Sequence, residues 1–488
     1  MTPAPAAALH PTPTNPPVPP RLLPVLFIGV FMAALDTAVI APAIPVLRLA
    51  FGLDIREAGL LMVAFILFSL PSTALMANLG DRHGRRPVYL ACVGLFAAGS
   101  LLIALAPNFA TLLAGRALQG VGGGGIIPTA SAVIGDAVPP AQRGRALGLI
   151  GATYGMAFVL GPPLAALLMV VASWHWIFLL NLPIAALVLW LGQRALPRQT
   201  SSRLLPPLDG AGIVLVFLLL ACLVLGITRS ADEWLGRTLW PTLLALVLPL
   251  FVLLLWVEKR AAAQGVRPMI PLNLFQRRQL AVTYLLTAGA GFGMGSVIFL
   301  TSIATLAHGV APAQAGFVLL PMVLCSMAGS VAAGRLLNRL GARGVVMAGF
   351  ALLAVGYGAA AWPMAAVTGT LAAAPWGLGL FIAATMPVGL GVGVVVGGAL
   401  RSIAIDEAPI EQRGAAQGLV NIFTSGGTLM SATLIGAVTE FADGGVHGDA
   451  GGLRLAYGGV AVLMALMLLA TLALRSAPVG APALNPGG

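Results

Sequence analysis

The sequence predicts an all-α polytopic membrane protein with fourteen transmembrane helices. Of its 488 residues, 59% are hydrophobic and only 8% are charged, whereas an average soluble domain carries about 25% charged residues. The apolar residues gather in stretches near the length of roughly 20 residues that a helix needs to cross a hydrocarbon core about 30 Å thick. Basic residues gather in alternate connections between these stretches. The composition therefore excludes a water-soluble globular protein.

The even number of predicted helices places both termini on one side of the membrane. Of the 26 Lys and Arg residues, 20 fall in segments on the side of the termini and five on the other. Cytoplasmic segments carry an excess of basic residues, so we expect both termini to be cytoplasmic in a multi-pass protein of the cell (inner or cytoplasmic) membrane. The net charge of +11 then reflects topology rather than a nucleic-acid partner. The predicted helices span residues 22–47, 58–79, 88–106, 109–135, 145–170, 176–195, 210–228, 238–257, 280–306, 314–336, 345–364, 377–400, 414–439 and 455–474.

Two polar linkers divide the helices into groups of six, two and six. The first twenty residues contain eight prolines, which indicates an extended, disordered tail. The predicted organisation is a cytoplasmic tail (1–21), an N-terminal six-helix bundle (22–196), a linker with two extra helices (197–260), a cytoplasmic linker (261–278), a C-terminal six-helix bundle (279–475) and a second cytoplasmic tail (476–488).

The two groups of six helices are related by an internal repeat. Residues 136–149 (DAVPPAQRGRALGL) and 406–419 (DEAPIEQRGAAQGL) match at eight of fourteen positions, and 77–86 is echoed by 334–344. The matches lie in polar loops after the second or fourth helix of each half, where chance similarity between apolar stretches does not account for them. Duplicated halves that rock against one another around a central site are typical of secondary transporters.

The residues that could build other kinds of site are scattered. The three cysteines sit singly in apolar stretches and the five histidines are far apart, so the spacing predicts no metal site, disulfide framework or cofactor. A membrane-embedded enzyme would need a His, Asp, Glu or Cys cluster at one membrane face, and none is found. The short tails argue against a nontransporting sensor or scaffold. We therefore predict that the protein is not an enzyme.

Asp36 and Arg116 are the charged residues that stand out inside predicted helices. At 1.5 Å per residue, Asp36 lies about 16 Å and Arg116 about 12 Å from the outer surface. Intramembrane charges usually face a cavity or a partner, and burial disfavours the charged carboxylate, so Asp36 can take up a proton. Gln119, one turn from Arg116 on the same face, can exchange hydrogen bonds with both. The alternatives are a carboxylate permanently paired for packing, and one that contacts substrate directly.

Five motifs occur in order along the first half: LDTAVIAPAIP (35–45), GDRHGRR (80–86), GRALQGVGGGG (115–125), LGPPLAALL (160–168) and WHWIFLLNLP (174–183). With these motifs in this order, the chain resembles the fourteen-helix drug:proton antiporter family of the major facilitator superfamily. The resemblance implies two pseudo-symmetric six-helix bundles plus two inserted helices. It also implies that Arg116 lies near the acidic site of the first helix, and that Gly161 and Pro162 form the antiporter motif of the fifth.

The loop between the second and third helices is predicted to form a cytoplasmic gate. Its residues are Asp81, Arg82, Gly84, Arg85 and Arg86. Gly84 permits the chain reversal, Arg85 can pair with Asp136, and Asp81 can accept hydrogen bonds from a helix N-terminus, which by resemblance is the helix that begins near Arg413. The alternative is that these arginines act only as topology determinants.

The predicted function is proton-coupled antiport that exports lipophilic or cationic organic compounds (multidrug efflux) by alternating access. The expected partners are a small organic substrate, the proton and the lipid bilayer. The alternative is a dedicated exporter of an endogenous metabolite, antibiotic or siderophore on the same fold. Whether a periplasmic adaptor also takes part is left open by the sequence.

Overall fold

The computed structural model describes residues 21–475 apart from 139, 198–208, 229–237, 267, 269, 271, 366–376, 410–412 and 443–449. The described residues form thirteen helices that are long and apolar enough to cross a membrane. The remaining predicted span coincides with α5 (Pro140–Val171), whose outer part Leu160–Val171 is also apolar. The predicted all-α polytopic fold is confirmed. The predicted tails and most of the first linker lie outside the described residues.

The first half consists of α1 to α7, and its helix ends follow from local sequence. Asp54 and Glu57 form a capping box that starts α2, with Asp54 Oδ1 accepting from the Glu57 amide at 2.6 Å. Asn108 caps α4 by accepting from the Thr111 amide at 2.9 Å. Side-chain acceptors of this kind satisfy amides that lack an intrahelical partner. The helices are α1 (Leu22–Phe51), α2 (Ile55–His83), α3 (Arg85–Ala104), α4 (Phe109–Ala137), α5, α6 (His175–Leu179) and α7 (Asn181–Ala195).

The two inserted helices are α8 (Gly210–Thr228) and α10 (Trp240–Ala263). Helix α8 packs against α2 of the first half and against α17 (Arg413–Ala442) of the second. Helix α10 packs mainly on α8, and its buried residues are Leu254, Glu258 and Ala261. The insertion therefore contacts the seam between the halves mainly through α8, while most of α10 faces outward. The predicted boundary at residue 260 falls within α10.

The second half contains helices with more interruptions than the sequence predicts. The predicted span 280–306 is divided by the short 3-10 turn η2, and the span 377–400 continues through the π-helical turn η4. The elements are η1 (Leu272–Gln276), α11 (Arg278–Ser296), η2 (Val297–Phe299), α12 (Leu300–His308), η3 (Pro312–Gln314), α13 (Ala315–Val318), α14 (Leu320–Ala365), α15 (Gly377–Val394), η4 (Val395–Ala399), α16 (Leu400–Glu407), α17, α18 (Ala450–Ala470) and η6 (Thr471–Ala473).

The internal repeat is visible in the backbone at two glycines. Gly84 separates α2 from α3 with φ 92° and ψ 144°, and Gly341 interrupts α14 with φ 69° and ψ 168°. Residues with a side chain rarely adopt a positive φ, so glycine is the residue that allows each break. The loop expected between the second and third helices is thus a single-residue hinge, repeated at the corresponding place in the second half.

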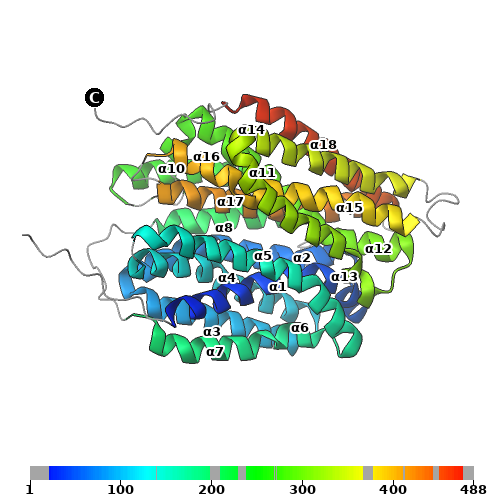
Figure 1. The fold of residues 1–488 in the computed structure, drawn as a ribbon, viewed down its shortest axis with the longest axis horizontal. Coiled ribbons are helices and arrows are strands. Elements are labelled where there is room, and N and C mark those ends of the chain that lie inside the picture. Colours follow the sequence, from blue (N-terminus) through cyan, green and yellow to red (C-terminus); the bar gives the residue numbers. More distant parts are fainter. Residues whose placement is uncertain are drawn as a thin grey trace, which may run out of the picture.

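The two halves form two layers of long helices (Figure 1). They share one apolar core, to which the first half contributes residues near the end that the basic residues predict to be extracellular, such as Leu47 and Leu61, beside Ile303 and Leu319 of the second half. At the opposite end the first half has a core of its own, which includes Leu26, Tyr89 and Ile134 and takes no residue from the second half. The halves therefore meet mainly at the predicted outer end.

Candidate functional site

The charged pair predicted from depth is present and fully enclosed. Arg116 Nη1 donates to Asp36 Oδ2 at 2.7 Å, and the two side chains are 0% and 1% exposed. Gln119 bridges the pair, because its Oε1 accepts from Arg116 Nη1 at 2.8 Å while its Nε2 donates to Asp36 Oδ1 at 2.9 Å. The predicted pairing of α1 with α4 is therefore confirmed as geometry.

Two polar residues that sequence reasoning left out of the site complete it. Asn181 at the start of α7 donates from Nδ2 to Asp36 Oδ1 at 3.0 Å. The hydroxyl of Ser100 on α3 lies 2.8 Å from Gln119 Nε2 and 3.2 Å from Asn181 Nδ2, and donates to the Phe96 carbonyl at 2.9 Å. Both residues are buried. Asn181 stands in the 174–183 motif, which was the signal that could have found it.

The guanidinium of Arg116 is held on two further sides by α2. Its Nε donates to the Leu61 carbonyl at 3.0 Å, and its Cζ lies 4.7 Å from the centre of the Phe65 ring, at the distance of a cation–π contact. Its Nη2 has no hydrogen-bond partner among the described residues. The cation is thus fixed in position with one donor still to be satisfied.

Backbone contact between α4 and its neighbours sets the depth of this network. A Cβ added at Gly120 would collide with the Phe65 carbonyl of α2, and one added at Gly122 would meet the Phe96 amide of α3 at 2.5 Å. Small residues let membrane helices approach this closely. The glycine run of the 115–125 motif therefore brings Arg116 and Gln119 up against α1, α2 and α3, and it serves packing rather than phosphate binding.

The hydrogen bonds suit an ionised Asp36. Its oxygens accept from three donors, which come from Arg116, Gln119 and Asn181. A carboxylate can only accept hydrogen bonds, whereas a protonated carboxyl must also donate one. Removing the charge of Asp36 would leave the buried Arg116 cation without its counter-ion, a costly state in a low-dielectric interior. The charges of Asp36 and Arg116 therefore depend on one another.

Helix α1 connects this network to the contact between the halves. Pro45 has no amide hydrogen, so the Ala41 carbonyl one turn earlier lacks its helical partner. That carbonyl accepts instead from Thr301 Oγ1 of the second half at 2.9 Å. Ala41 lies little more than one turn beyond Asp36 on α1. We call this cross-half hydrogen bond the outer contact.

The predicted cytoplasmic gate is described in part. Arg85 Nε lies 2.6 Å from Asp136 Oδ2, so this predicted ion pair is confirmed, and Arg86 donates to the Gln193 carbonyl of α7. Arg82 lies in the last turn of α2. The side chains of Asp81 and Arg413 lie outside the described residues, so the predicted contact across the halves stays a prediction.

The antiporter motif brings α5 against α1. A Cβ added at Gly161 would lie 2.6 Å from the Ala38 Cβ, and the following Pro162 is buried within α5. Ala38 is two residues from Asp36 on α1. Gly161 therefore permits close packing of α5 against α1 beside the polar network.

The second half carries no charged counterpart of the network in the described residues. The position that matches Arg116 is Met386, which is 39% exposed. In its place lies a cluster of hydroxyls around η2, where Tyr357 and Tyr457 donate to the carbonyls of Gly293 and Ser296. The charged pair of Asp36 and Arg116 therefore has no counterpart among the described residues of the second half. Within these residues no three His, Cys, Asp or Glu side chains could hold a metal ion.

Comparison with known proteins relates most of the chain to one family. Residues 26–432 match the family model described as Major Facilitator Superfamily. The chain is 32% identical over 413 residues to the uncharacterized MFS-type transporter YfiU of Bacillus subtilis, an alignment that covers 83% of this chain and 77% of that protein.

Two named transport proteins and one solved structure are also similar. The chain is 29% identical to the multidrug transporter protein MdtP of Bacillus subtilis, over 87% of this chain and 76% of that protein. It is 28% identical to the tetracenomycin C resistance and export protein of Streptomyces glaucescens, over 85% and 75%. The crystal structure of an auto inhibited POT family peptide transporter superposes with a TM-score of 0.68 over 95% of this chain and 99% of that chain, at 20% identity. At that identity the superposition shows a shared fold alone.

Proposed function

Because the chain belongs to the major facilitator superfamily, we propose that it is a proton-coupled antiporter that exports lipophilic or cationic organic compounds by alternating access. The observation that carries the proposal is the enclosed pair of Asp36 and Arg116, which joins α1 to α4 at 2.7 Å. When one member of a buried ion pair is titratable, adding a proton to it can change the packing of the two helices that the pair joins.

The first step of the proposed cycle is proton uptake by Asp36. Protonation removes the charge that balances Arg116, and the guanidinium, enclosed with one unsatisfied donor, then favours any rearrangement that lets it reach water or another acceptor. Arg116 is anchored to α2 through the Leu61 carbonyl. Because Arg116 on α4 contacts both α1 and α2, a movement of Arg116 would act on these three helices of the first half together.

The second step carries this change to the interface between the halves. Asp36 and the Ala41 carbonyl belong to the same helix, and Ala41 accepts the cross-half hydrogen bond from Thr301. The halves meet at the predicted outer end, while the first half has a separate core at the predicted inner end. We infer an inward-facing state in which Asp36 is ionised, as expected after a proton has been released inside. This assignment rests on the cytoplasmic location of both termini, which the basic residues favour.

The predicted cytoplasmic gate belongs to the opposite state. In the proposed cycle, Asp81 binds the N-terminus of α17 when the inner end closes, whereas the pair of Arg85 and Asp136 is already formed in the inward-facing state. Gly84 supports this role, because its positive φ lets α2 and α3 meet at a single residue. The Arg85 and Asp136 pair within the first half keeps this hinge tied to the end of α4, the helix that carries Arg116.

The substrate class follows from the scarcity of charge and from the relatives. Asp36 is the acidic residue at the centre of the network, so a divalent cation would find no second counter-charge there. Lipophilic monocations or neutral compounds fit this arrangement. A relative is named as a multidrug transporter, which supports export of varied organic compounds.

The test is transport in inside-out vesicles with an imposed pH gradient, with tetraphenylphosphonium and ethidium as substrates. Wild type should accumulate them when the vesicle interior is acidic, and Asp36→Asn should abolish the response to the gradient. Asp54→Asn is the matched control, since asparagine also caps a helix and α2 should remain intact. Gradient-driven uptake that survives in Asp36→Asn would remove Asp36 from the coupling role.

A dedicated exporter of one antibiotic or metabolite is the second candidate, and it is favoured by the relative named for tetracenomycin C export. The same vesicles distinguish the two candidates. A broad panel of lipophilic cations should be taken up by a multidrug exporter. Gradient-driven uptake of a polycyclic aromatic antibiotic without uptake of any lipophilic cation would favour the dedicated exporter.

A further inference from the structure

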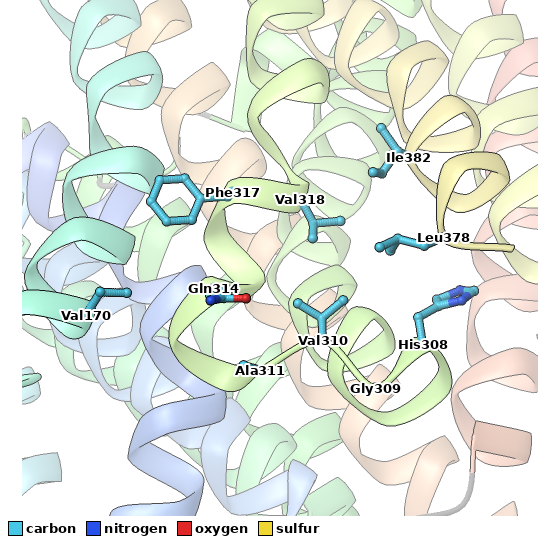
Figure 2. Close-up of a pocket in the computed structure, with 10 residues that line it drawn as sticks. All are labelled: Val170, His308, Gly309, Val310, Ala311, Gln314, Phe317, Val318, Leu378 and Ile382. Carbon is cyan, nitrogen blue, oxygen red and sulfur yellow. The ribbon is translucent and has the colours of Figure 1, made fainter. Parts of the chain in front are cut away.

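Two hollows on the surface of the described residues differ in the charge around them. One, at the predicted outer end, lies beside Val310, Phe317 and Leu378 (Figure 2), and no Asp, Glu, Lys or Arg of the described chain lines it. The other is a groove along α10 that ends next to two basic residues. A charge beside an apolar groove favours ligands that combine a hydrocarbon chain with an opposite charge.

The groove lies on the face of α10 that the rest of the protein leaves uncovered. Of its side chains, Val252 is 56% and Trp256 is 55% exposed. The lining residues recur at the three- and four-residue spacing of one helix face, and in a membrane-spanning helix an uncovered apolar face meets lipid. They are Leu248, Pro249, Val252, Leu253 and Trp256.

Two cations follow Trp256, where the groove ends. Lys259 and Arg260 stand three and four residues later, so they lie one turn further along the same face. Both are exposed, and Arg260 Cζ lies 5.2 Å from the centre of the Trp256 ring, within the range of a cation–π contact. The carboxylate of Glu258 faces the other way, because it is 1% exposed and a Cβ added at Gly212 of α8 would lie 2.9 Å from its Oε1. The exposed face at this end is therefore positive.

The lengths along α10 match one leaflet of a bilayer. At 1.5 Å per residue, the groove from Leu248 to Trp256 spans about 12 Å, and Arg260 lies about 6 Å beyond it. Half of a hydrocarbon core about 30 Å thick is about 15 Å. Tryptophan side chains gather at the membrane–water interface. With Trp256 at that level, the groove follows the acyl chains of the predicted inner leaflet and the two cations reach the phosphate groups.

We propose that this face of α10, from Leu248 to Arg260, is a binding site for an anionic phospholipid. One acyl chain lies in the groove, and the phosphate binds Lys259 and Arg260 through charge-assisted hydrogen bonds. A zwitterionic lipid makes the same apolar contact but is attracted less by the two cations. The site shares no residue with the network of Asp36 and Arg116, and it rests on the membrane-spanning fold rather than on the proposed export function.

The test compares two photoreactive lipids on the full-length protein in phosphatidylcholine nanodiscs. Phosphatidylglycerol and phosphatidylcholine, each with a diazirine in the middle of one acyl chain, are added in equal amounts to separate samples. Pepsin, which does not cleave at Lys or Arg, and mass spectrometry then give the ratio of anionic to zwitterionic labelling for each peptide.

The attraction of one basic residue to anionic lipid corresponds to about fivefold in binding. The exposed face of α18 around Leu466, which is 52% exposed, serves as the reference, because a single arginine, Arg475, follows that helix. The ratio should therefore be about fivefold higher at residues 248–256 than on α18.

Variants separate a local site from the overall charge of the protein. Lys259→Gln combined with Arg260→Gln should lower the ratio at residues 248–256 to no more than that of α18. Lys259→Arg combined with Arg260→Lys keeps both charges and should keep most of the preference. Arg335→Gln combined with Arg339→Gln removes the same charge from exposed positions on α14, and it should leave the ratio at α10 unchanged.

Three results would overturn the inference. Equal ratios at residues 248–256 and on α18 in wild type would mean that Lys259 and Arg260 act only as topology determinants. An equal fall of the α10 ratio in the variant of Arg335 and Arg339 would show that net charge, rather than this face, attracts the lipid. Loss of labelling on addition of glycerol 3-phosphate, which carries the anion without acyl chains, would show that the cations bind free phosphate and that the groove plays no part.

Discussion

At the scale of single residues, Asp36 has more partners than a packing role requires. Three side chains from α4 and α7 donate to it, and two of these also contact Ser100. Protonation of either carboxyl oxygen would place a donor opposite donors that already point at it, and would break at least one of these hydrogen bonds. The network therefore opposes partial rearrangement, and we expect the ion pair to open as a unit.

The first prediction concerns the stability of this pair. Asp36→Asn leaves the Arg116 cation buried without an anion, and breaking a buried pair in this way costs about 3–5 kcal/mol. Asp36→Asn combined with Arg116→Gln removes both charges and should recover most of that loss. Thermal unfolding in detergent measures the order, which should be wild type, then the double variant, then Asp36→Asn. A double variant no more stable than Asp36→Asn would show that charge imbalance is not the cause.

The charged residues of this site could be predicted from the sequence more readily than its neutral ones. Asp36 and Arg116 could be found because charge is rare inside apolar helices, and helical rise alone placed them at similar depth. Ser100 and Asn181 could not be assigned in the same way, since hydroxyl and amide side chains are common in such helices and their role depends on which helices touch. The outer contact could not be predicted either, because predicting it requires the position of Thr301 relative to Pro45.

At the scale of helices, the places where helices are interrupted say as much about the fold as the helices themselves. Gly84 and Gly341 hinge corresponding helix pairs in the two halves, and η2 and η4 interrupt helices only in the second half. The hinges were foreseeable from the repeat of 77–86 in 334–344, although the predicted spans leave several residues between the helices at each place. The turns were not foreseeable, because freed carbonyls there are satisfied by distant hydroxyls such as that of Tyr357.

The second prediction tests the first hinge. Gly84→Ala forces a side chain into a backbone conformation that costs of the order of 1–3 kcal/mol, so it should lower the unfolding temperature and reduce transport. Gly94→Ala on α3 is the matched control, because a Cβ there meets nothing within 4 Å. Differential scanning fluorimetry of the two variants makes the comparison. Equal stability of Gly84→Ala and Gly94→Ala would contradict a strained hinge.

The third prediction tests the outer contact. Thr301→Val keeps the shape of the side chain and removes the hydroxyl that binds the Ala41 carbonyl. Hydrogen bonds between membrane helices average about 0.6 kcal/mol, so the balance between states should shift about threefold toward the outward-facing one. Thr305→Val is the control, since that hydroxyl bonds only within its own helix at 2.9 Å. Accessibility of an outer-facing reporter cysteine to an impermeant maleimide would measure the shift.

At the scale of the whole molecule, the halves are joined unevenly. One apolar core spans both at the predicted outer end, and the first half keeps a separate core at the other end. Helix α8 leans on both halves, whereas α10 packs mainly on α8. We therefore expect the halves to separate by opening the shared core, with the inserted pair following the motion through α8.

The fourth prediction concerns this motion. In a background without Cys92, Cys222 and Cys325, Ala41→Cys and Thr301→Cys joined by a short bifunctional thiol reagent should stop transport. Each single variant treated with the same reagent should keep its activity, and reduction of a cleavable cross-link should restore transport in the double variant. Continued transport by fully cross-linked protein would show that the outer end does not need to open.

The enclosure of Asp36 has a further, kinetic consequence. Its side chain is 1% exposed, so a reagent that modifies protonated carboxyls from the apolar phase, such as dicyclohexylcarbodiimide, cannot reach it until the surrounding helices part. The rate of Asp36 modification should therefore reach a plateau as the reagent concentration rises. At the plateau the rate is limited by opening of the protein, as it is in amide hydrogen exchange that depends on local opening. The plateau would therefore measure how often the first-half helices around Asp36 move apart.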